Sequence, residues 1–258
     1  MNADRRTAAA AGVLFLVTEV AAIAGLALYR PVLDGPAGTL GPGAAESAFA
    51  GALCELVLVA AVIGTGFVLF PVIRRQFEGP ALGYACLRLL EAVVITVGVL
   101  GILTLVTLRQ EAAGASAAAG AATDAAAAGA DRALLALHDW TFLIGPNIAL
   151  GLNTVLLAYV MYRSRLVPRP IAVLGLIGGP LICASAVAVM FGLHEQLSAT
   201  GTAAALPVFA WEVALAVRLI ARGFDPARPP AGAPATTRSA EPAQPAEPAE
   251  PAQPAQPA

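Results

Sequence analysis

Lysine is absent from the sequence, and charged residues of any sign are scarce. They occupy 12% of the 258 positions, whereas a soluble domain carries about 25%. All 15 basic residues are therefore arginines, and the net charge of -2 is too small to indicate a nucleic-acid partner. Hydrophobic residues make up 58% of the chain, and a soluble protein of this composition would aggregate. The composition excludes a soluble domain and points to a lipid bilayer as the main partner.

Metal, cofactor and hydrolase motifs are also missing. The three cysteines, Cys54, Cys86 and Cys183, are odd in number and form no CxxC, so neither a disulfide framework nor a zinc site is expected. His138 and His194 come from separate segments at unspecific spacing, and HExxH, CxxCH, GxSxG and phosphate-binding glycine loops do not occur. No metal and no cofactor are expected, and a non-catalytic protein is favoured over an enzyme.

Six apolar runs are long enough to cross a bilayer, which takes roughly 20 helical residues. Helices are expected because unpaired backbone groups are costly in lipid and the runs lack the alternation of barrel strands. The predicted fold is an all-α, polytopic integral membrane bundle of six transmembrane helices within residues 1–224. The spans are predicted near residues 8–28, 48–70, 82–108, 133–161, 171–193 and 203–220.

The arginines predict the orientation, because cytoplasmic loops retain positive charge. The connections on the outer side hold only Arg30, Arg109 and Arg132. Both termini are therefore expected in the cytoplasm. The connections on the side of the N-terminus hold eleven arginines: Arg5, Arg6, Arg74, Arg75, Arg163, Arg165, Arg169, Arg218, Arg222, Arg228 and Arg238.

Two segments leave the span count open. The alanine-rich stretch Ala112–Ala130 is interpreted as an outer loop, because alanine drives insertion weakly and a seventh span would reverse the arginine bias. The first run follows Arg5 and Arg6, as a signal peptide would, but its length and central Glu19 favour a retained span.

The composition changes abruptly after Gly223. From Glu241 onward the chain consists of six triplets of Glu or Gln followed by Pro and Ala, which favour extended polyproline II segments and form no core. Residues 225–258 are predicted to be a disordered cytoplasmic tail. It is either a solvated extension or a docking strip for a cytoplasmic partner.

Charged residues inside the predicted spans are the strongest candidates for function. A charge at the bilayer centre costs about 2.5–3.5 kcal/mol on insertion scales, so such residues usually face a bundle interior. Arg88 precedes Glu91 by three residues and shares its helical face, which predicts an ion pair. The intramembrane candidates are Glu19, Glu55, Arg88, Glu91 and Glu212.

A second set of polar residues opens the fourth run, in the stretch ALHDWTFLIGPN. Pro146 predicts a kink, and the heptad spacing of Asp139, Pro146 and Asn153 predicts one stripe that avoids lipid. The next run is expected to be interrupted at 178–180, either as a packing kink or as a transporter-type break. The candidates at the outer end are His138, Asp139, Asn147 and Asn153.

The segments HDWTFLIGPN and YVMYRSRLVPRPIAVLGLIGGPLICAS, with the opening RRTAAAAGVLFLVTEVAAIAG, resemble the bacterial multi-pass membrane family called domain of unknown function 4386. The resemblance covers roughly residues 5–222 and departs from the family at Pro146, where many relatives have Gln. It implies six helices in a bacterial cytoplasmic membrane and no particular activity. The matching residues are His138, Gly145, Tyr162, Arg163, Ser164, Leu166, Pro168, Arg169 and Gly175.

Three functions remain open at this point. The first is a small transporter or permease whose intramembrane carboxylates bind a cation or proton. The second is a structural or regulatory module that presents its tail to a cytoplasmic partner. The third is an intramembrane enzyme, for which Ser185, His138 or a glutamate would have to be reactive. The sequence gives neither the ligand nor the oligomeric state.

Overall fold

The computed structural model describes residues 3–114 and 121–226, and within them every regular element is helical. The predicted tail therefore lies outside the described residues, apart from its first two positions. The helices are α1 (Ala3–Leu33), α2 (Ala44–Arg74), α3 (Glu78–Gly114), α4 (Ala121–Leu143), the π-helix η1 (Ile144–Ala149), α5 (Leu150–Ser164), α6 (Arg169–Met190) and α7 (Ala199–Ala221).

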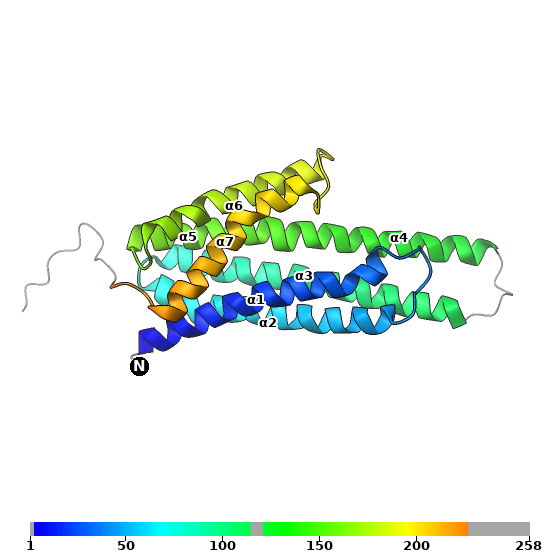
Figure 1. Cartoon of the computed structure of the whole chain (residues 1–258), viewed down its shortest axis with the longest axis horizontal. Coiled ribbons are helices and arrows are strands. Elements are labelled where there is room, and N and C mark those ends of the chain that lie inside the picture. Colours follow the sequence, from blue (N-terminus) through cyan, green and yellow to red (C-terminus); the bar gives the residue numbers. More distant parts are fainter. Residues whose placement is uncertain (1–2, 115–120, 227–258) are drawn as a thin grey trace, which may run out of the picture. The chain divides into compact units, whose positions relative to one another are not determined.

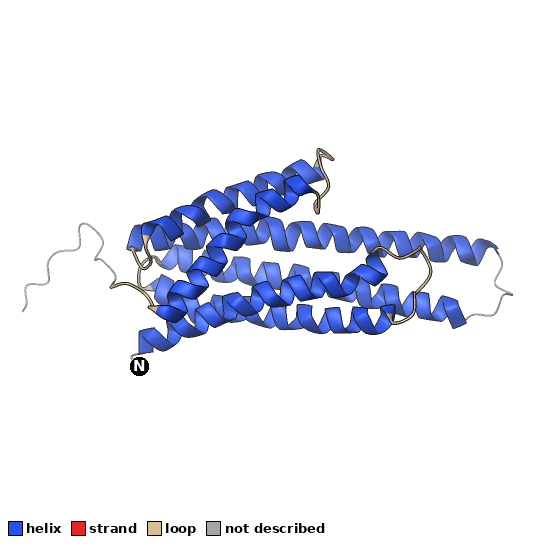
Figure 2. Cartoon of the chain, viewed as in Figure 1, coloured by secondary structure: helices blue, strands red, loops and turns tan. Residues whose placement is uncertain are grey.

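The elements α4, η1 and α5 follow one another without a break and form one long rod (Figures 1 and 2). Counted in this way, the described residues contain six helices long and apolar enough to cross a membrane. Large apolar side chains such as Val20, Phe67 and Leu100 are exposed on the outside, where a bilayer would cover them. The predicted fold class, an all-helical multi-pass membrane protein, is confirmed.

The helices pack in a closed ring. Each packs against the next one in the chain, and α7 returns to pack against α1. Arg5 near the start of α1 donates hydrogen bonds to the carbonyls of Leu219, Ile220 and Ala221 in the last turn of α7. The start of α1 and the end of α7 therefore lie at the same end of the bundle, as an even number of crossings requires (Figure 1).

The two longest helical segments extend past the bilayer thickness. With 37 residues, α3 is about 55 Å long, against a hydrocarbon core of about 30 Å. The prediction of a loop over Ala112–Ala130 is corrected here, because α3 continues to Gly114 and α4 begins at Ala121. Alanine inserts weakly into lipid but is the best helix former, so helical structure continues where insertion stops.

A buried ion pair ties this extension to the rest of the ring. Arg109 is 2% exposed and donates to both carboxylate oxygens of Asp131, over 2.6 Å from Nε and 3.0 Å from Nη2. Its remaining nitrogen donates to the carbonyls of Val32 at 2.9 Å and Thr39 at 3.4 Å. A single guanidinium thus connects α3, α4, the end of α1 and the loop that follows it.

The expected interruption of the fifth run is absent, because α6 continues through Gly178, Gly179 and Pro180. The glycines serve close packing instead. A Cβ on Gly178 would lie 2.7 Å from the backbone nitrogen of Val208 in α7, and one on Gly179 would lie 2.7 Å from the carbonyl oxygen of Gly151 in α5. This geometry supports the interpretation of close helix contact rather than a transporter-type break.

We expect Gly178→Ala to destabilise the protein by about 1–3 kcal/mol, because the new methyl group meets backbone atoms that cannot turn away. Gly129→Ala in α4 is the matched control. A Cβ there has no neighbour within 4 Å, so the substitution should stabilise slightly through helix propensity. Unfolding in a mixed-micelle denaturant titration measures both; equal effects would contradict the packing role of Gly178.

Candidate functional site

Arg88 and Glu91 on α3 form the centre of the candidate site. They lie three residues apart on one helical face, and Arg88 Nη1 is 3.1 Å from Glu91 Oε2. One turn earlier, Tyr84 accepts a hydrogen bond from Arg88 Nε at 3.1 Å. The predicted ion pair is present, and both of its members are buried.

Three other helices bring polar side chains to the same place. Glu212 of α7 lies 3.3 Å from Arg88 Nη2, and Asn153 of α5 donates from Nδ2 to Glu91 over 2.7 Å. Glu19 of α1 lines the same space as Glu212. One guanidinium thus gathers groups from four helices.

These charged groups line a cavity of about 190 Å³ inside the ring. Glu19, Arg88, Glu91 and Glu212 form its polar wall, and Glu55 of α2 lines it as well. The rest of the lining is apolar, including Leu58, Ile95, Phe142 and Leu150. All five intramembrane candidates therefore line one common space.

The site contains more acids than bases. Among the described residues that line the cavity, Arg88 is the single cationic side chain and four are glutamates. The faces of Phe15 and Tyr84 lie 5.4 and 5.5 Å from the Arg88 guanidinium carbon, which adds cation–π stabilisation to the ion pairs. The arrangement can hold a proton or a small cation, and no described residue contributes a second positive charge.

The rod carries the other predicted candidates and departs from the expected heptad stripe. Pro146 lies in the π-helical turn, lines the cavity and cannot donate to the carbonyl of Phe142; Asn147 donates to that oxygen from Nδ2 at 3.1 Å. A π-turn takes an extra residue, which rotates the preceding segment. As a result, Asp139 is exposed and His138 is buried, so the predicted stripe is wrong at its first member.

Tyrosines are the members of the site that the sequence analysis did not single out. Tyr84 binds Arg88, and Tyr29 of α1 donates to Glu55 Oε2 at 3.2 Å. Tyr84 lies four residues before Arg88, which places both on one helical face, so their contact was predictable from the sequence. Tyr29 and Glu55 belong to different helices, and no local pattern joins them.

Of the residues named for an enzyme, the glutamates line the cavity, whereas Ser185 and His138 do not. Ser185 Oγ lies 3.4 Å from His194 Nε2, whose other ring nitrogen lies 3.0 Å from the carbonyl oxygen of Glu195. Neither Ser185 nor His194 lines the cavity. Trp211 is fully buried, and its ring approaches Gly175 of α6, so it packs the helices together.

Replacing Arg88 with Met should destabilise the fold by about 3–5 kcal/mol, because Glu91 and Glu212 would remain buried without their partner. The control is Arg74→Met, which breaks the exposed pair with Glu78 at 3.0 Å and should cost less than about 1 kcal/mol. Chemical denaturation in detergent provides the comparison. Similar losses for the two variants would show that the buried cluster does not hold the helices together.

The described residues contain no group of three His, Cys, Asp or Glu side chains placed to hold a metal ion. No curated protein and no solved structure matches the chain. A family model does match it, over residues 10–223. These residues include all six membrane-spanning helical segments apart from the first residues of α1, together with every residue of the cavity wall. The chain belongs to the family described as Domain of unknown function (DUF4386).

Proposed function

We propose that the protein is a small transporter or permease that binds a proton or another cation at its intramembrane carboxylates. The observation that supports this proposal is the unequal charge of the cavity wall. Glu19, Glu91 and Glu212 surround one guanidinium, that of Arg88. A cavity that served packing alone would have no reason to bury unmatched acids, which are costly in hydrocarbon.

The net charge of the glutamates and Arg88 indicates which kind of ligand the cavity would bind. If Glu19, Glu91 and Glu212 were all ionised, the cluster with Arg88 would carry a net charge of -2. A proton or another cation bound beside these carboxylates would reduce this negative charge. Low polarity inside the ring disfavours a net charge, so binding of a proton or another cation would stabilise the cluster.

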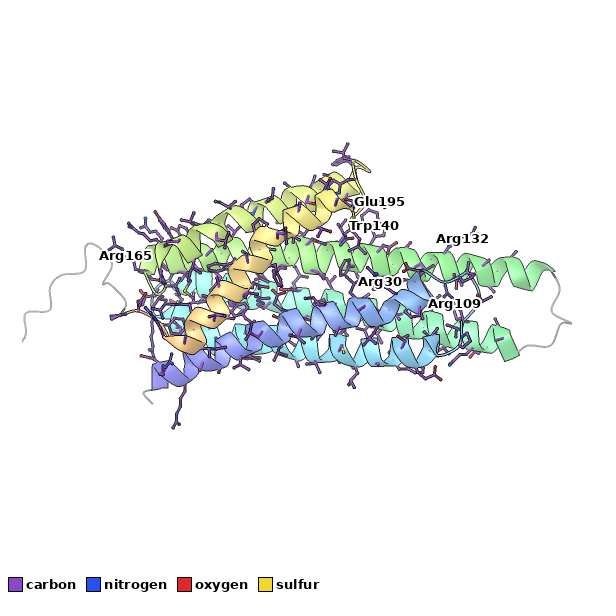
Figure 3. All side chains as sticks on the ribbon, in the orientation of Figure 1. Arg30, Arg109, Arg132, Trp140, Arg165 and Glu195 are labelled. Atoms are coloured by element: carbon purple, nitrogen blue, oxygen red, sulfur yellow. The ribbon has the colours of Figure 1, made fainter. Side chains whose placement is uncertain are left out.

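We further propose a bacterial cytoplasmic membrane with both chain ends in the cytoplasm. In Figure 3, Arg165 lies at the end of the bundle that holds the start of α1, and Arg30, Arg109 and Arg132 lie toward the opposite end. Arg109 is neutralised there by buried Asp131. Most of the free positive charge is therefore at one end, which the positive-inside rule assigns to the cytoplasm.

Cation binding should raise the thermal stability of the purified protein. A ligand present at 100 times its dissociation constant stabilises by about 2.7 kcal/mol. Thermal unfolding is measured against a panel of Na⁺, K⁺ and tetramethylammonium at constant ionic strength and at several pH values. We expect stabilisation by at least one cation, and its loss in Glu19→Gln, because this carboxylate has no ion pair with Arg88 among the described contacts.

Glu78→Gln is the matched control for that experiment, since Glu78 is an exposed glutamate outside the cavity. It should keep the full stabilisation. Identical responses of Glu19→Gln and Glu78→Gln would refute a role for the cavity. A wild-type protein whose stability depends on no cation and no pH change would refute the proposed function as a whole.

Cysteine accessibility tests the orientation. In a background with Cys54, Cys86 and Cys183 replaced by alanine, Gly41→Cys should react with a membrane-impermeant maleimide in intact cells, because it lies in the exposed loop after α1. Glu78→Cys, at the opposite end, should react only after the membrane is permeabilised. The reverse pattern would invert the topology, and labelling of both positions in intact cells would contradict a single orientation.

A further inference from the structure

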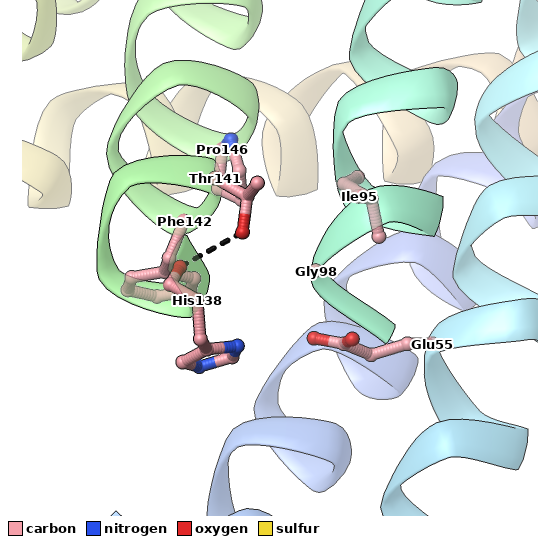
Figure 4. A pocket seen from close by; sticks show the side chains of 7 residues that line it. All are labelled: Glu55, Ile95, Gly98, His138, Thr141, Phe142 and Pro146. Carbon is pink, nitrogen blue, oxygen red and sulfur yellow. Dashed lines mark hydrogen bonds between the residues drawn. The ribbon is translucent and has the colours of Figure 1, made fainter. Parts of the chain in front are cut away.

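A second polar site lies beside the cavity, between α2, α3 and α4. Figure 4 shows the His138 ring of α4 turned toward the Glu55 carboxylate of α2, with Gly98 of α3 between them. The space between these side chains is about 10 Å³. A water molecule needs about 10–15 Å³ measured in this way, so the space has the size of one water. Its lining consists of Glu55, Ile95, Gly98, His138, Thr141, Phe142 and Pro146.

His138 provides the strongest indication of a ligand. Its side chain is 5% exposed, and its Nδ1 has no hydrogen-bond partner among the described residues. Such a buried, unpaired group costs about 1–3 kcal/mol. The ring is held in place by stacking on Phe142, at 6.2 Å between centroids, and by the edge of Tyr29 at 5.7 Å. The structure thus fixes an unsatisfied nitrogen in one direction, toward the space.

Glu55 offers a complementary group on the other side. Its Oε2 accepts the hydrogen bond from Tyr29, so Oε1 is available to a ligand. The Thr141 hydroxyl donates to the carbonyl of His138 at 2.9 Å and retains its lone pairs. Glu55 from α2 and Tyr29 from α1 are the titratable groups that face His138, while α3 contributes only Ile95 and Gly98 to the lining.

Gly98 creates the space. A Cβ built on it would lie 2.7 Å from Thr141 Oγ1 and 3.9 Å from His138 Nδ1, so any side chain would occupy the position of the ligand. One turn along, Gly101 behaves differently, because its Cβ would meet only ordinary contacts, the nearest being Leu137 Cδ2 at 3.6 Å. The glycine at 98 thus permits the close approach of α3 to Thr141 and leaves the space beside His138 open.

We propose that one bound water molecule bridges His138 Nδ1 and the Glu55 carboxyl group and forms a proton-transfer link. Glu55 gives its proton to the water while the water gives one of its own to Nδ1, which leaves a carboxylate and an imidazolium; the reverse transfer resets the site. Glu55, Ile95, Phe142 and Pro146 line both this space and the larger cavity. The link therefore connects the cavity with His138. This inference rests on the proposed function, because proton transfer has a role only if the cavity takes up a proton or another cation.

The test is infrared difference spectroscopy of the full-length protein in lipid nanodiscs, between samples in ordinary and oxygen-18 water. The wild type should show an isotope-sensitive band of one strongly hydrogen-bonded internal water. Gly98→Ala should lose it because the methyl group fills the space, and Gly101→Ala should keep it as the matched control. Persistence of the band in Gly98→Ala, or its absence from the wild type, would overturn the proposal.

A second variant, His138→Phe, keeps the proposal testable if Gly98→Ala does not fold. His138→Phe keeps a ring that can stack on Phe142 but removes the nitrogen, so it should also lose the band; retention would overturn the proposal equally. Cation-dependent thermal stabilisation separates this inference from the proposed function, because neither Gly98 nor His138 lines the larger cavity. Both variants should keep that stabilisation within twofold in apparent affinity.

Discussion

The guanidinium of Arg88 is the constraint on which the rest of the bundle depends. It is 2% exposed, and in hydrocarbon nothing but protein can compensate its charge. Glu91 on its own helix supplies one partner, and Glu212 supplies the other from α7, more than a hundred residues away. Asn153 of α5 then orients Glu91. Three helices are thereby held at one depth, a requirement that general apolar packing would not impose.

The cavity follows from a balance between that polar centre and close packing around it. Glycines of α6 let α5 and α7 approach to backbone contact, so this side of the ring is tight. On the cavity side, Pro146 of the π-helical turn and Ile95 of α3 line the space together. Space therefore remains where the carboxylates are. The polar candidates and the irregular backbone coincide, as expected where a membrane protein exposes a site to a ligand rather than to lipid.

The number of helices and the acidic residues of the cavity were predictable from the sequence, because lipid penalises charge and requires long apolar runs. The pairing of Arg88 with Glu91 was equally local. The position of His138 was not, since a π-turn changes the register of the whole preceding segment while Pro146 alone suggests only a kink. The Arg109–Asp131 pair spans a chain reversal, and hydropathy does not reveal such a contact. The alanine-rich stretch was misjudged because poor insertion was equated with poor helix formation.

The helix α1 closes the ring of helices. Its Arg5 binds the last carbonyls of α7, and its Glu19 forms part of the cavity wall. If this helix were removed by processing, the remaining five helices would no longer form a closed ring. Acyl chains could then reach Arg88 and Glu212 directly, and the unprotected end of α7 would fray. The buried polar cluster is thus sheltered from lipid only while the first helix is in place.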